Sequence, residues 1–152
     1  MVALLVIHNF MRWFVLLFGI LTVVRSIGGL SAKRDFKPSD SQANLFFMIG
    51  MDIQLLIGLG LYYAGDWYQK LEHLGQNMQD PYNRFFTMEH GFTMLIAWVL
   101  VHIGRASVKK AGTSQSKFRK SLIFFGIALL LILVATPWPF REIVSRPWFR
   151  WF

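Results

Sequence analysis

The apolar residues of this sequence are gathered into four long blocks, which short polar segments separate. The blocks cover residues 2–24, 45–64, 85–103 and 121–136. Since a helix needs roughly 17–25 residues to cross the hydrocarbon core of a bilayer, the first three blocks are long enough and the fourth is short. No linker is long enough to separate domains, so we expect one membrane domain over residues 1–152. The pattern predicts an all-α integral membrane protein, folded as an antiparallel up-and-down four-helix transmembrane bundle.

The composition agrees with a membrane location. Hydrophobic residues make up 55% of the chain and charged residues only 16%, whereas charged residues are about 25% of a typical soluble domain. The absence of cysteine excludes disulfides, thiolate zinc sites, iron–sulfur clusters and cysteine nucleophiles. The net charge of +8 comes largely from Lys and Arg in the loops, where basic residues fix the orientation of membrane helices. The lipid bilayer is therefore the expected partner, and no nucleic acid is expected.

The distribution of basic residues predicts which loops face the cytoplasm. The loops at residues 25–44 and 104–120 hold four and six Lys or Arg residues, against five on the opposite face. Short loops rich in Lys and Arg stay on the cytoplasmic side of a membrane. We therefore expect these two loops in the cytoplasm and both termini on the outer side.

Two segments at the edges of the blocks have a distinct local character. Gly28-Gly29 and residues 37–40 carry turn residues, and we expect them to break the chain after the first block. The tail, residues 137–152, alternates aromatic residues with Arg, which suits the headgroup zone of a membrane. We expect the tail to lie along the outer membrane–water boundary; the alternative is a contact patch for a partner subunit.

Histidines inside two of the blocks are the first candidates for a functional site. Ionisable residues within membrane spans are rare and usually functional. At 1.5 Å per residue, His8 and His90 lie one to two turns from the outer ends of their blocks, at similar depth. Haem takes axial His ligands from facing helices, so a haem held between these two imidazoles is geometrically possible. Arg12 shares a helix face with His8 and could meet a propionate, and Glu89 adjoins His90.

Other interpretations of the same residues stay open. His8 could hydrogen-bond Glu89 or a backbone carbonyl and serve only the structure. The set of His8, Glu89 and His90 could instead bind a bare divalent ion or relay protons, although no His-x-x-His or Glu-x-x-His spacing supports a tight metal site. His102 lies about 120° around the helix from His90, so we expect it near the cytoplasmic interface, and His73 is expected to be solvated.

A second polar constellation is predicted near the middle of the membrane. Arg12 and Asp52 are at similar depth in the first two blocks, and an unpaired charge there is strongly disfavoured. We therefore expect them to face the bundle interior and pair, directly or through Gln54 or water. This network either fixes the register of the helices or serves a proton or quinone role. A proton-coupled carrier that uses Arg12, Asp52 and Glu89 is a further hypothesis, which no inverted repeat supports.

Several motifs taken together resemble a known family. They are His8-Asn9-Phe10-Met11-Arg12-Trp13, Gln54-Leu55-Leu56-Ile57-Gly58-Leu59-Gly60-Leu61-Tyr62-Tyr63, Glu89-His90, Gly104-Arg105, Pro137-Trp138-Pro139-Phe140 and Arg146-Pro147-Trp148-Phe149. The chain resembles small four-helix bacterial membrane proteins labelled cytochrome b-like. The resemblance implies a bacterial inner (cytoplasmic) membrane protein with a b-type haem, and His8 and His90 as its ligands. Unlike cytochrome b proper, the chain has no stacked His pair along each of two helices.

Two functions are therefore our hypotheses. The first is a membrane redox or electron-transfer protein that holds haem b between the first and third spans, with quinone or a larger respiratory assembly as its partner. The second is a non-catalytic accessory or scaffold subunit of a membrane complex, in which the buried polar network is structural. No catalytic residue is predicted in either case.

Overall fold

All regular structure in the described residues is helical. The computed structural model describes residues 1–151, so Phe152, the last residue of the predicted tail, lies outside the described part. The elements are α1 (Val2–Ser31), α2 (Pro38–Ala64), η1 (Trp67–Leu71), α3 (Leu74–Asn77), α4 (Pro81–Arg84), η2 (Phe85–Glu89), α5 (His90–Lys109) and α6 (Ser114–Ala135). Four helical stretches are long and apolar enough to cross a membrane: Val2–Ser31, Pro38–Ala64, Pro81–Lys109 and Ser114–Ala135.

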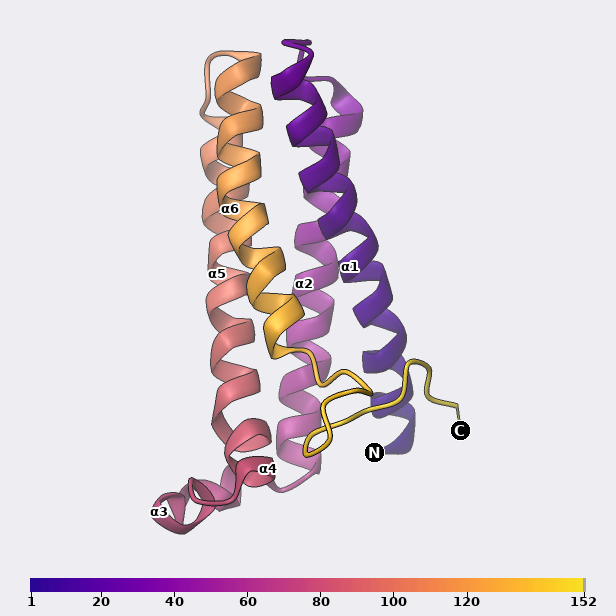
Figure 1. The fold of residues 1–152 in the computed structure, drawn as a ribbon, viewed down its shortest axis with the longest axis vertical. Helices are drawn as coiled ribbons and strands as arrows, with labels where there is room; N and C mark the ends of the chain where they lie inside the picture. Colours follow the sequence, from indigo (N-terminus) through magenta and orange to yellow (C-terminus); the bar gives the residue numbers. More distant parts are fainter. Residues whose placement is uncertain (152) are drawn as a thin grey trace.

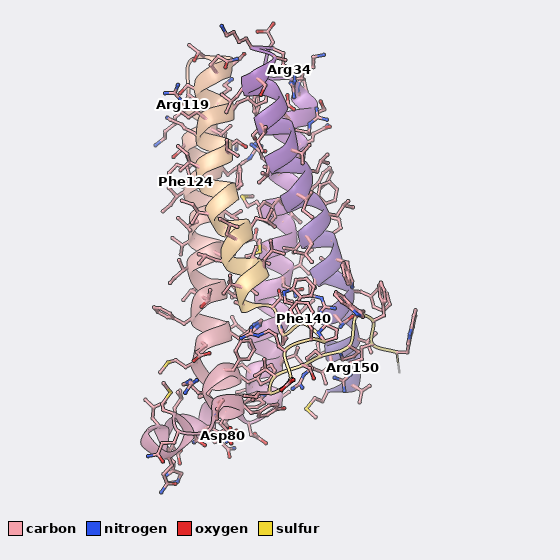
Figure 2. The ribbon with its side chains drawn as sticks, viewed as in Figure 1. Arg34, Asp80, Arg119, Phe124, Phe140 and Arg150 are labelled. Carbon is pink, nitrogen blue, oxygen red and sulfur yellow. The ribbon has the colours of Figure 1, made fainter. Side chains whose placement is uncertain are left out.

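The long helices lie side by side and define two ends of the molecule (Figure 1). One end carries the connections at residues 32–37 and 110–113, and we call it the loop end. The other end carries the N-terminus, the short helices of residues 65–89 and the tail after α6, and we call it the terminal end. Figure 2 shows Arg34 and Arg119 at the loop end and Asp80 at the terminal end. Polar and charged loops therefore cap both ends of an apolar bundle.

The predicted break at Gly28-Gly29 is wrong, because α1 continues through both residues to Ser31. A Cβ atom at Gly29 would lie 2.4 Å from the ring of Phe118 on α6, whereas nothing lies within 4 Å of one at Gly28. Gly29 is therefore a contact residue: its missing side chain lets α1 approach α6 closely. The chain leaves the helix only at Lys33, which has a positive φ of 49°.

The loop end is closed by a buried carboxylate. Asp40 is 2% exposed and accepts hydrogen bonds from Arg25 at 2.7 Å, from Arg34 at 2.7 and 2.9 Å, and from the Lys37 amide at 2.8 Å. Pro38 occupies the first turn of α2, where its missing N–H is no loss. The hydrogen bond to Asp40 raises the pKa of Arg34 above its ordinary value. Residues 37–40, which were expected to break the chain, therefore form the start of α2.

The apolar core fills the bundle from the loop end to about its middle. Phe47, Val101 and Phe125 are fully buried, and the rings of Phe47 and Phe125 are 5.8 Å apart. The fourth span is longer than the sequence pattern suggests, because α6 begins at Ser114, where the Thr113 hydroxyl accepts a hydrogen bond from the Ser116 amide at 3.2 Å. Toward the terminal end, the core gives way to a cavity.

Candidate functional site

A cavity of about 180 Å³ lies inside the terminal end of the bundle. All four long helices contribute to its wall, and the tail after α6 covers part of it. Its lining is mainly apolar, with polar side chains from each direction: His8, Asn9, Arg12, Gln54, Tyr62, His90, Thr136, Arg146 and Arg150. An apolar pocket with a few convergent polar groups is the usual form of a ligand site.

The structure brings the two predicted imidazoles together in this cavity. The ring centroids of His8 on α1 and His90 on α5 are 6.4 Å apart, and the ring planes meet at 68°. Imidazole–metal bonds are about 2.0–2.1 Å long, so two such bonds in line plus the radii of two rings add up to a similar separation. The centroid spacing alone matches one metal atom between the two rings, and it equally matches a direct edge-to-face contact of two rings.

The position of His90 depends on an irregular turn that precedes it. Residues Phe85–Glu89 form a π-helical turn, η2, directly before α5 begins at His90. A π turn adds one residue to the helix and so rotates the next residues about the helix axis, and such turns are frequent at functional sites. The His90 Nδ1 atom lies 2.8 Å from the carbonyl oxygen of Ala135 at the end of α6. If Nδ1 carries the proton, Nε2 keeps its lone pair and is free to bind a metal.

His8 reaches the cavity from a close contact between α1 and α2. The Gln54 side chain donates a hydrogen bond to the His8 carbonyl oxygen at 3.1 Å, and a Cβ atom at Gly58 would lie 3.5 Å from His8 Cε1. The His8 Nδ1 and Gln54 Oε1 atoms are buried and have no hydrogen-bond partner within residues 1–151. Neither imidazole forms a hydrogen bond with Glu89. The alternative in which His8 serves the structure through a hydrogen bond to Glu89 is therefore not observed.

The tail, and not Asp52, bonds Arg12. The residue is 8% exposed, and its guanidinium donates hydrogen bonds to the carbonyl oxygens of Pro147 at 3.3 Å and Trp148 at 2.6 Å, while its Nε atom has no hydrogen-bond partner within residues 1–151. Asn9 also donates to Pro147 and Trp13 to Trp148, at 3.2 and 3.0 Å. The tail therefore packs over the first helix and closes one side of the cavity. Figure 2 labels two residues of the tail, Phe140 and Arg150; of these, Arg150 lines the cavity.

The predicted pair between Arg12 and Asp52 is wrong for a geometric reason. Asp52 Oδ1 accepts a hydrogen bond from the Trp98 indole at 2.6 Å and lies 2.8 Å from His102 Nε2. Residues two apart on a helix point in different directions, so Gln54 faces α1 while Asp52 faces α5. The direction of the two side chains around their helix axes was not predicted correctly from the sequence. His102, expected at the interface, is the partner of Asp52.

Glu89 does not join the cavity. Its carboxylate pairs with Arg84 at 2.7 Å, the side chain is 45% exposed, and it is absent from the cavity lining. Glu89 is the last residue of the π turn and His90 is the next residue, so the two side chains point in different directions around the helix axis. Arg12, Asp52 and Glu89 thus have three separate sets of partners, so they do not form the chain that a proton carrier would need. His73 is exposed, as expected.

Sequence reasoning missed the contribution of the tail to the cavity. Arg146 lines the cavity, donates a hydrogen bond to the Tyr82 hydroxyl at 2.7 Å, and lies 4.4 Å from the centre of the Phe86 ring. Tyr62 was also missed; its hydroxyl bonds the Thr87 carbonyl oxygen at 3.1 Å. The alternation of Arg with aromatic residues in the tail was the available signal, but it is equally typical of a membrane interface.

The donor set limits the chemistry of the site. Within residues 1–151, no group of three or more His, Cys, Asp or Glu side chains could hold a bare metal ion. Two imidazoles suffice for a metal that brings its own four equatorial ligands, as in a porphyrin. Comparison with known proteins adds no family to this geometry: no protein-family model, curated protein or solved structure matches the chain.

Proposed function

We propose that the chain is a membrane electron-transfer protein that holds one b-type haem between His8 and His90. The single observation that carries this proposal is the 6.4 Å separation of the two imidazole rings across a shared cavity. Haem supplies reversible one-electron chemistry when it is bound. The two His residues would hold its iron, and the sequence resemblance to cytochrome b-like proteins points in the same direction.

The surroundings of the two imidazoles support the same assignment. Metal-bound His almost always donates its second N–H to a carbonyl or carboxylate, which fixes the tautomer and raises the basicity of the ligand. The Ala135 carbonyl is placed to do this for His90. Arg12, Arg146 and Arg150 surround the cavity with positive charge, which suits an apolar ligand that carries carboxylates.

The size of the cavity sets a condition on this proposal. Pockets for drug-sized ligands are about 300–1,000 Å³, which is larger than the cavity of about 180 Å³. A porphyrin therefore enters only if part of the wall moves outward. The tail is the part of the wall that is not a transmembrane helix, so its movement disturbs the bundle least.

We further propose that the four apolar helices form an antiparallel bundle in the bacterial inner membrane. Contact with lipid would explain why large apolar side chains on these helices, such as Leu56 and Val134 at 69% and 72% exposure, are not covered by protein. The basic loops at the loop end would lie in the cytoplasm, so the cavity would open near the outer face. A quinone or a larger membrane complex would then be the electron partner.

A visible absorption spectrum tests the haem proposal. The protein, purified in detergent with haem added during expression or afterwards, should show a Soret band that shifts on reduction with dithionite. His8→Ala and His90→Ala should each abolish the low-spin spectrum, because each removes an axial ligand. His73→Ala, at an exposed position away from the cavity, is the matched control and should keep the spectrum.

A colourless protein that takes up no haem would overturn the proposal. In that case the alternative, an accessory or scaffold subunit of a membrane complex, is favoured by a specific observation. Asn9, Arg12 and Trp13 all bond the tail, and this use of polar groups would then be purely structural. Purification under mild conditions would identify an accessory or scaffold subunit, since the chain should then be recovered with a larger complex.

A further inference from the structure

A carboxylate–imidazole pair lies on the outside of the bundle, far from both of its ends. Asp52 is at the middle of α2, and its side chain is 38% exposed; His102 on α5 is 36% exposed. The Trp98 ring contacts the His102 ring, with centroids 4.4 Å apart and the ring planes tilted by 50°. The pair therefore occupies the seam between α2 and α5, on a surface that would face hydrocarbon. The membrane insertion of the bundle, proposed above, is required for this placement, whereas haem is not.

Only one of the two polar side-chain atoms of each residue in this pair has a hydrogen-bond partner within residues 1–151. Asp52 Oδ1 accepts from Trp98 and contacts His102 Nε2, while Asp52 Oδ2 and His102 Nδ1 bond no residue within 1–151. Arg105, one turn further along α5, does not bond the pair; its guanidinium donates to the Ser41 hydroxyl and carbonyl oxygens at 2.9 and 3.1 Å. Polar atoms in hydrocarbon need a partner, since no water is there to bond them.

We infer that a second copy of this chain covers the α2–α5 seam in the membrane. One copy presents an acceptor, Asp52 Oδ2, beside His102 Nδ1, a ring nitrogen that donates to a carboxylate when it carries a proton. A two-fold axis sets residue i of one copy against residue j of the other and the reverse. The Asp52 carboxylate of each copy then accepts from His102 of its partner copy, so one symmetric contact satisfies both free atoms on both chains.

The surface around the pair suits a helix–helix contact of this kind. Leu56 and Leu59 follow Asp52 at i+4 and i+7 and are 69% and 57% exposed; Leu95 and Val99 precede His102 by seven and three residues and are 44% and 40% exposed. Residues at these spacings share a helix face. The polar pair is thus enclosed by an apolar stripe, which a second copy would bury away from lipid.

Cysteine crosslinking in membranes tests the inference directly, because the chain has no cysteine of its own. Leu56→Cys, or Val99→Cys on the other helix, should yield a covalent dimer with a short bis-maleimide reagent. Leu130→Cys is the matched control: it is 63% exposed on α6, at a similar distance from the loop end. It should stay monomeric. The membranes are washed with carbonate first, so that only integral protein is scored.

The role of the pair is tested by Asp52→Asn in the Leu56→Cys background. The amide can still accept from Trp98, so the monomer should fold, which a circular dichroism melt checks. Dimerisation, followed by lipid dilution, should weaken about tenfold, as expected for the loss of two interhelical hydrogen bonds of ordinary strength. Equal crosslinking at positions 56 and 130, or a dimer unaffected by Asp52→Asn, overturns the inference. Absence from the washed membranes would instead overturn the proposed membrane insertion.

Discussion

Arg12 is a buried charge that depends on the backbone of a distant segment. Its guanidinium donates to the carbonyl oxygens of Pro147 and Trp148, and it also lies over the rings of Trp13 and Trp138, at 5.2 and 5.7 Å from their centroids. Partial negative charge on carbonyl oxygens and ring faces thus takes the place of a counter-ion. Together with Asn9 and Trp13, Arg12 holds the tail against α1.

Replacing Arg12 by Met keeps an unbranched side chain that is apolar and shorter, and removes the guanidinium that donates both hydrogen bonds. The carbonyl oxygens of Pro147 and Trp148 then lose a charged donor, and such hydrogen bonds contribute about 1.5–3 kcal/mol each. We expect the unfolding free energy in detergent to fall by about 2 kcal/mol or more and the tail to become sensitive to trypsin. Mass spectrometry of the fragments measures this.

Arg119→Met is the control, because Arg119 is exposed at the loop end, as Figure 2 shows. It should change neither the stability nor the cleavage of the tail. If Arg12→Met behaves in the same way as Arg119→Met, the tail is held by its other contacts and Arg12 has a different role.

The site residues show which information a sequence carries about a bundle of long apolar helices. Residue counts along a span give depth, and depth alone correctly suggested that His8 and His90 could meet. Direction around the helix depends on how the helices pack, so Asp52 was assigned to Arg12 when it faces His102. The bond from His90 to the Ala135 carbonyl could not be foreseen, because every residue has such an oxygen.

At the scale of elements, the spans were foreseen better than their ends. The four apolar blocks all lie within or largely within the four long helical stretches, because hydrophobic runs of this length strongly predict membrane helices. The ends were missed where tertiary contacts decide them. Gly28-Gly29 resembled a breaker, but the contact of Gly29 with the buried ring of Phe118 keeps α1 helical to Ser31.

These adjacent glycines give an internally controlled prediction. Gly28→Ala and Gly29→Ala share a gain in helix propensity of at most about 1 kcal/mol, because both lie in the last turn of α1. Only the methyl group at position 29 overlaps Phe118, which is fully buried and packed by Phe36. Overpacking of this kind lowers stability by about 1–3 kcal/mol.

We therefore expect Gly28→Ala to be neutral or stabilising and Gly29→Ala to be destabilising, measured by unfolding in mixed detergent micelles. The difference between the two variants reports the approach of α1 to α6. Two variants of equal stability would mean that the helices are further apart at this level.

At the scale of the whole molecule, the two ends of the bundle differ in charge and should face different compartments. Gly75 lies in α3 at the terminal end and Gly112 in the loop before α6, and nothing lies within 4 Å of a Cβ atom at either position. Because the chain lacks cysteine, Gly75→Cys and Gly112→Cys should be silent single probes.

A membrane-impermeant maleimide applied to intact spheroplasts should label Gly75→Cys at once. Gly112→Cys should react only after the membrane is permeabilised, because the basic loop is expected in the cytoplasm. The opposite pattern would mean an inverted bundle. Labelling of both positions in intact cells would contradict four spans.

The bonds between α1 and the tail also constrain the order of assembly. Asn9 and Arg12 are separated from their acceptors by 135 to 138 positions along the chain. The wall of the cavity is therefore incomplete while translation and insertion proceed, and it closes only after α6 has been placed. If the cavity holds the proposed haem, the haem has its easiest entry during that interval, before Pro147 and Trp148 dock. Haem loading of the finished protein should then be slower than loading during biosynthesis.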